Sequence, residues 1–275
     1  MTDQTNDEQA PLDDLIGIGS EIAGGAAGAA IGFFAAGPVG AVAGGAAGPI
    51  VTHTFRKLAA ELKQRVLGRG EEIRLGATLA FAAAKISENI ANGQQVRQDD
   101  FFLERSGDRS AAEEIAEGVL LIAQREYQER KLKFYGNLLA NIAFRTDIDR
   151  DLANALIIQA ERMSYRQMCI LPLIVRSNEF SVPLGRGYTL AQDNAKFSSL
   201  VADIYDLAQQ GIMDDDPLDR RGMISVGREL APGRLLFDLM ELKDIDKVEL
   251  ERIAVYLKPE VEEKPDEGTE AASAG

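Results

Sequence analysis

The sequence predicts a mainly α-helical protein with an N-terminal glycine-zipper segment, a helical bundle and a small C-terminal winged-helix-like α+β module. Three observations carry this prediction. Residues 22–55 contain no charged side chain and are rich in glycine and alanine. Amphipathic segments with helix-capping residues follow from 56 to 175. Residues 222–242 then combine a short β-type stretch, a turn and a helical stretch, the pattern of a winged-helix-like module.

The uncharged run contains a ladder of small residues. They recur at a spacing of four, which places them on one face of a helix. A face made of glycine and alanine lets a second backbone approach closely, as it does where transmembrane helices associate. The sequence therefore predicts a surface for self-association and membrane insertion, made of Gly24, Gly28, Gly32, Ala36, Gly40, Gly44 and Gly48.

A hinge at Gly37 and Pro38 interrupts this run, because proline breaks the hydrogen-bond ladder of a helix. We expect two short helices, at 15–36 and 39–55, that form a kinked membrane span or a hairpin. Leu, Ile, Phe and Val drive insertion, but alanine and glycine outnumber them here. Such a segment suits a protein that shelters it in one state and inserts it in another. The alternative is a Gly/Ala hairpin buried in a soluble protein.

The remaining boundaries follow from composition. Residues 1–12 and 259–275 are acidic and polar, and we expect them to be disordered. The zipper segment occupies 13–55 and a helical region 56–160. Residues 161–258 form the winged-helix-like part, which we expect to sense a signal and to assemble the oligomer.

Basic side chains gather directly after the uncharged run. Such a flank is typical of the cytoplasmic side of a membrane helix, although a solvated helix face has the same appearance. Gly68 and Gly70 indicate a break, and Gly93 should end the next helix. The cluster consists of Arg56, Lys57, Lys63, Arg65, Arg69 and Arg74.

Capping residues mark the helices of the bundle. Ser110 with Glu113 three positions later forms a capping box, so one long helix is predicted over 111–145. Asp149 or Asp151 should begin the next helix.

The C-terminal part has its own helix signals. Ser164 caps a helix that Pro172 should kink or end. Residues 177–195 are expected to be a loop. A helix from Ser198 to Gln210 should stop at Gly211.

Charge limits the choice of partner. The chain has 30 basic and 44 acidic residues and a formal net charge of −14. Much of the surplus lies at the two acidic ends, so the middle is only mildly acidic. Binding along duplex DNA needs a basic face and is not expected. A pocket for a short nucleic acid or nucleotide stays possible, and its candidate contacts are Arg186, Arg220, Arg221, Arg228 and Arg234.

Catalytic chemistry finds no support in the sequence. There is one histidine, His53, and one cysteine, Cys169, so no nucleophile–base pair and no metal-binding spacing occurs. No phosphate-binding loop or dinucleotide motif is present, and no cofactor is expected. Cys169 lies in an apolar context and should be buried. A lone cysteine fits a reducing compartment, either the cytoplasm or the inner face of the bacterial inner membrane.

Residues 130–174 resemble the helical core of Abi-alpha-type abortive-infection proteins of bacteria. The two phrases that carry the resemblance are RKLKFYGNLLANIAF and LANALIIQAERMSYRQMCILPLI. Together with the N-terminal segment, the chain is also similar to effectors of the Hailong defence system. This resemblance implies an oligomeric membrane channel that short single-stranded DNA holds shut and that infection releases.

The sequence thus favours an oligomeric, membrane-acting effector in anti-phage defence that is not an enzyme. Its expected partners are copies of itself and membrane lipid. A soluble nucleic-acid-binding or regulatory winged-helix protein is the alternative, with the Gly/Ala run as an oligomerisation core.

Overall fold

A computed structural model describes residues 68–104, 108–184, 187–189, 195–214 and 223–257 of the 275-residue chain. This part is mostly helical, as predicted. The glycine ladder, the hinge at Gly37 and Pro38, and both acidic ends lie outside the described residues, so these predictions stay open.

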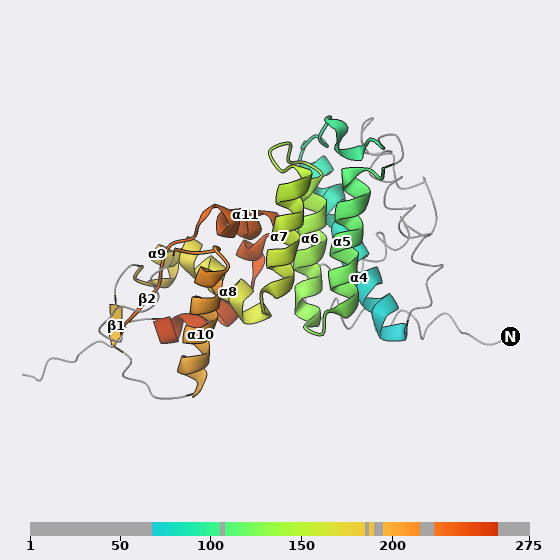
Figure 1. Cartoon of the computed structure of the whole chain (residues 1–275). Coiled ribbons are helices and arrows are strands. Elements are labelled where there is room, and N and C mark those ends of the chain that lie inside the picture. The colour runs from blue at the N-terminus through green and yellow to red at the C-terminus, as the bar shows by residue number, and fades with distance from the viewer. Residues whose placement is uncertain (1–67, 105–107, 185–186, 190–194, 215–222, 258–275) are drawn as a thin grey trace, which may run out of the picture.

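Within the described residues, the bundle is formed by helices α4 to α7 (Figure 1). They are α4 (Arg69–Ala91), α5 (Ala111–Arg125), α6 (Leu132–Ile142) and α7 (Arg150–Arg162). Close packing of α4 on α6 depends on Gly136, because a Cβ there would lie 2.6 Å from the Cβ of Phe81 and 2.8 Å from the carbonyl oxygen of Thr78. Glycine is therefore needed at this crossing.

The C-terminal group of elements lies on the other side of α7 from α5 in Figure 1. β1 pairs with β2 in antiparallel register, with Tyr188 opposite Ile224. Single-turn 3₁₀ helices lie at Asp100–Phe102, Glu129–Lys131, Leu242–Asp244 and Val255–Leu257. The other elements are α8 (Tyr165–Val175), α9 (Ser177–Phe180), β1 (Gly187–Thr189), α10 (Ala195–Gln209), β2 (Met223–Ser225), α11 (Ala231–Leu239) and α12 (Lys247–Ala254).

The predicted helix caps are confirmed. The Ser110 hydroxyl accepts a hydrogen bond from the Glu113 amide at the start of α5, and Ser164 caps α8 in the same way. Asp149 caps α7 through the amide of Leu152. Gly211, which follows α10, has a φ of +68°, as expected for a glycine that ends a helix.

The single helix predicted over 111–145 is wrong. α5 ends at Arg125 and α6 begins only at Leu132. The Glu126 backbone is extended, and its buried carboxylate binds Lys131 and Tyr135. Periodicity alone did not reveal this break, because both helices place apolar residues toward the same core.

Three smaller predictions also need correction. Residues 177–195, expected to be a loop, contain α9 and β1. α10 begins at Ala195, three residues before the predicted Ser198. Of the two effects predicted for Pro172, ending the helix is wrong, because α8 continues to Val175, and a kink stays a prediction.

Side chains of α4 and α6 join the bundle to the C-terminal end of α11. The Asn141 amide donates to the carbonyl oxygen of Leu239 at 2.8 Å, and Asn137 donates to that of Met240 at 3.1 Å. Lys85 of α4 forms a 2.5 Å ion pair with Glu241. One continuous apolar core extends on both sides of this joint.

The described residues include no helix with both the length and the apolar character needed to cross a bilayer.

Candidate functional site

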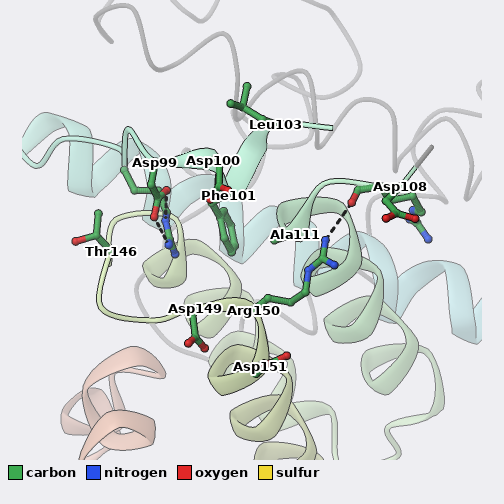
Figure 2. Close-up of a pocket in the computed structure, with 12 residues that line it drawn as sticks. Asp99, Asp100, Phe101, Leu103, Asp108, Ala111, Thr146, Asp149, Arg150 and Asp151 are labelled. Carbon is green, nitrogen blue, oxygen red and sulfur yellow. Dashed lines mark hydrogen bonds and ion pairs between the residues drawn. The ribbon is translucent and has the colours of Figure 1, made fainter. Parts of the chain in front are cut away.

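A cavity of about 410 Å³ lies at the end of the bundle, where residues 97–103 meet the N-terminal ends of α5 and α7 (Figure 2). Its volume falls in the range of small-molecule sites. Its lining residues are Arg97, Asp99, Asp100, Phe101, Leu103, Asp108, Arg109, Ala111, Thr146, Asp149, Arg150 and Asp151.

Arg97 fixes one wall of this cavity. Its guanidinium forms a two-armed pair with Asp99 and donates to the carbonyl oxygen of Ile148 at 2.7 Å. It also lies 4.1 Å from the centre of the Phe101 ring. The hydrogen bond from Arg97 holds the pKa of Asp99 below its ordinary value. Arg97 therefore joins the loop before α5 to the loop before α7.

The opposite wall is the N-terminal turn of α7. Asp149, Arg150 and Asp151 lie there in Figure 2. The Arg150 guanidinium donates to the carbonyl oxygen of Arg109 at 3.1 Å and lies 3.5 Å from the Glu114 carboxylate. Two loops and two helix starts thus meet at a polar cavity.

The lining limits which ligands fit. Aspartates outnumber arginines in it, and Arg97 and Arg150 are engaged by protein oxygens. A small polar or cationic molecule fits this lining better than a polyanion such as a nucleic-acid strand. Among the described residues, no group of His, Cys, Asp and Glu side chains could hold a metal ion.

Only two of the five candidate arginines lie in the described part of the chain. Arg234 is engaged, since its Nε lies 3.3 Å from Asp238 Oδ2 and its Nη1 lies 3.8 Å from Glu229 Oε1. Arg228 is exposed. A ligand role for these two residues stays a prediction, as it does for Arg186, Arg220 and Arg221 outside the described residues.

A buried polar cluster between α5 and α6 was not predicted from the sequence. One oxygen of Glu126 accepts from Lys131 Nζ at 2.5 Å and from the Tyr135 hydroxyl at 2.7 Å. Burial lowers the pKa of Lys131 and raises that of Tyr135. Only the position of Glu126 directly after an amphipathic helix could have drawn attention to it.

A smaller cavity of about 300 Å³ adjoins the cluster. It lies between the end of α5 and the connection from α7 to α8. Its lining includes Arg125, Tyr127, Gln128 and Arg162. Tyr127 is 83% exposed, so this cavity has an open aromatic rim.

Comparison of the chain with protein-family models, curated proteins and solved structures found no match in any of the three.

Proposed function

We propose that this protein is an oligomeric, membrane-acting effector, of the pore- or channel-forming kind, in bacterial anti-phage defence. A change of signal or ligand at the helical body would release the activity. Residues 22–55 would supply the membrane-active surface. One observation carries the proposal: residues 22–55 contain no charged side chain and have a glycine or alanine at every fourth position.

The structure of α4 supports a link between the run and the body. Residues 77–83 of α4 are all buried, although they cover almost two helical turns. Ala80 and Ala83 form a buried cluster apart from the main core. A helix that is enclosed on every side is firmly anchored, so force or motion in the preceding chain would reach the bundle directly.

The cavity beside α5 and α7 is the place where we propose that a regulator binds. Arg97 and Arg150 connect its walls to the loops that set the positions of both helices. A bound molecule would therefore change how these loops pack.

We also propose a winged-helix-like arrangement for the C-terminal part. β1 and β2 pair with α10 between them in sequence, and Met213 pairs with Glu229 next to the same helix. The exposed side of α10 includes Asp206, whereas Asp203 binds Arg166. An acidic helix does not favour duplex DNA, so this module would serve protein contacts or a short ligand.

Dye release from liposomes tests the membrane role. We expect the activated full chain to permeabilise vesicles and a chain without residues 1–55 to be inactive. Gly28→Leu should also abolish leakage, because a large side chain blocks the ladder face. Ala30→Leu is the matched control, since it adds the same apolar side chain on the opposite face. If Gly28→Leu leaks as the wild type does, the ladder is not the active surface.

A second assay tests the nucleic-acid alternative. Short single-stranded and duplex oligonucleotides are titrated against the full chain at several salt concentrations. We expect no salt-dependent binding of duplex. Tight duplex binding that Arg228→Ala weakens would favour the alternative function.

A further inference from the structure

Helices α5 and α7 lie side by side and point in the same direction. Asn154 Nδ2 donates to Glu114 Oε1 at 2.6 Å near their N-terminal ends. Arg125 and Glu161 form a 3.3 Å ion pair near their C-terminal ends. The two helices therefore pack against each other in parallel along their length.

The sequences of the two helices are similar over twelve aligned positions, except that Glu117 and Ile122 of α5 align with Asn154 and Gln159 of α7. Residues 114–125 are EIAEGVLLIAQR, and residues 151–162 are DLANALIIQAER. Most inward positions agree in character, and Val119 and Leu156 are both fully buried. The match makes α5 and α7 two versions of one helical unit placed in parallel.

A stripe of the same residue classes recurs at the aligned positions of each helix. On α5 it faces α7, because Glu114 bonds Asn154 and the Gly118 position lies against Ile157, whereas on α7 it is exposed. Its order is an acid, a small residue, a large aliphatic residue and an arginine, at spacings of four, three and four, which fall on one helix face. Ile158, in the middle of the α7 stripe, is 49% exposed. The stripe residues are Glu114, Gly118, Leu121 and Arg125 on α5, and Asp151, Ala155, Ile158 and Arg162 on α7.

Such a stripe is complementary to its own reversed copy. When two copies lie antiparallel, the acid of one meets the arginine of the other, and the small residue meets the large one. Within the part of the chain that the structure describes, Asp151 and Arg162 make no ion pair or hydrogen bond. Both are exposed, so their charges are available to a second molecule.

We propose that the exposed stripe of α7 binds a second copy of the chain in an antiparallel, two-fold arrangement. Asp151 then lies opposite Arg162 of the partner subunit, and Ala155 lies opposite Ile158 of the partner subunit. A two-fold interface uses the same patch on both chains, which explains why one stripe contains both halves of each contact. The interface is separate from the glycine ladder and goes beyond the proposed membrane function.

Disulfide cross-linking of the full chain tests the arrangement. Two variants, Asp151→Cys and Arg162→Cys, are oxidised separately and as a mixture. We expect covalent dimers only in the mixture, because identical positions would lie about 16 Å apart along antiparallel helices. A disulfide requires Cα atoms within roughly 7 Å. Burial raises the pKa of the native Cys169 thiol to about 12, so this residue contributes no background.

The cross-linking experiment has two results that overturn the proposal. One is the absence of covalent dimer in the mixture. The other is equal cross-linking of either variant alone, which would indicate a parallel contact. Circular dichroism confirms beforehand that both variants are folded.

Charge reversal gives an independent test by sedimentation of the full chain. Asp151→Arg and Arg162→Asp each place like charges face to face, and each should weaken association about tenfold. Mixing the two variants, or combining both changes in one chain, should restore it. Glu251→Lys on the exposed side of α12 is the control and should have no effect. An unchanged association constant in both single variants would contradict the proposal.

The two proposals fail in different ways. Cross-linking and sedimentation use no membrane, and their variants differ from the wild type only at Asp151 or Arg162, so the differences between variants report on this face and not on the glycine ladder. Chains that pair at this face without releasing dye would retain the interface and lose the proposed function. Chains that release dye without pairing at this face would support the proposed function and contradict the interface.

Discussion

At the scale of single residues, Glu126 is a buried acid that accepts hydrogen bonds from three donors. Burial alone would raise its pKa, but hydrogen bonds from Lys131, the Gln128 amide and Tyr135 outweigh this effect. The pKa of Glu126 in the folded protein is therefore lower than its ordinary value of 4.5. The resulting stabilisation is fully present above pH 4.5 and is lost as pH falls through the folded-state pKa.

Replacing Glu126 by Gln should remove this pH dependence. The variant should be less stable by about 3 kcal/mol at neutral pH, because Lys131 stays buried without an opposite charge. Its free energy of unfolding should also fall less than that of the wild type below pH 4.5. Urea denaturation between pH 3 and 7, roughly the range over which the carboxylate titrates, measures both effects.

Two comparisons sharpen this test. Glu251→Gln removes an exposed carboxylate and should leave the stability nearly unchanged. The double variant Glu126→Gln/Lys131→Met should recover part of the lost stability, since no unpaired charge is left inside. A double variant less stable than Glu126→Gln would show that the 3.2 Å hydrogen bond from Lys131 to the carbonyl oxygen of Glu161 outweighs the cost of the unpaired charge.

Gly136 and Gly118 are matched glycines with opposite expected effects. Gly136→Ala should destabilise the protein by about 2 kcal/mol or more, because the new Cβ meets α4 backbone atoms at 2.8 and 2.9 Å. Gly118→Ala meets only the Ile157 side chain, at 3.6 Å, and should stabilise α5 by roughly 0.5–1 kcal/mol. Thermal unfolding of both variants measures the difference. Equal effects would mean that α4 can move away from α6 without loss.

At the scale of elements, the joint between α6 and α11 depends on two asparagines. Asn141 accepts from Asn89 and donates to Leu239, both at 2.8 Å. Asn141→Leu leaves both groups without this partner and should destabilise the protein by about 1–3 kcal/mol. Hydrogen exchange should increase in α11 and leave α5 unchanged. Asn154→Leu is the control, because Asn154 bonds only a half-exposed glutamate. Hydrogen exchange in α11 that rises equally in both variants would contradict this prediction.

The sequence predicted local features of these elements well. Ser110, Asp149 and Ser164 each cap a helix through the amide three residues further on, so the interaction lies within one short segment. The segment that contains Gly136 and Asn141 was noted in the sequence only because it resembles a segment of abortive-infection proteins. Its partners lie 52 to 103 residues away in the sequence, which no local pattern reveals.

In the candidate sites, too, local features could be predicted from the sequence and distant contacts could not. The walls of the cavity at the bundle end come from three separate segments, so their meeting depends on the packing of the whole bundle. The repeat in α5 and α7 is visible in the sequence, yet its meaning depends on the parallel placement of the two helices. The glycine ladder was the clearest sequence feature, and it lies outside the described residues.

At the scale of the whole molecule, the bundle and the C-terminal part share one core. The apolar cluster extends from Leu75 in α4 to Leu257, and buried polar contacts of Asn137 and Lys85 reinforce it at the joint. A shared core of this kind unfolds as one cooperative unit. A ligand that binds at the end of the bundle would then affect the stability of the C-terminal elements as well.

Single tryptophans can test this cooperativity, because the chain has none of its own. Phe144→Trp reports on the bundle and Tyr256→Trp on the C-terminal part, and both positions are only partly buried against the core. In each variant, tryptophan fluorescence and far-ultraviolet circular dichroism should give the same urea midpoint. Adding Asn141→Leu should weaken the joint, so the Tyr256→Trp midpoint should fall further than the Phe144→Trp midpoint. If the urea midpoints differ even when Asn141 is unchanged, the bundle and the C-terminal part are two independent units. A regulator in the cavity would then act on the bundle alone.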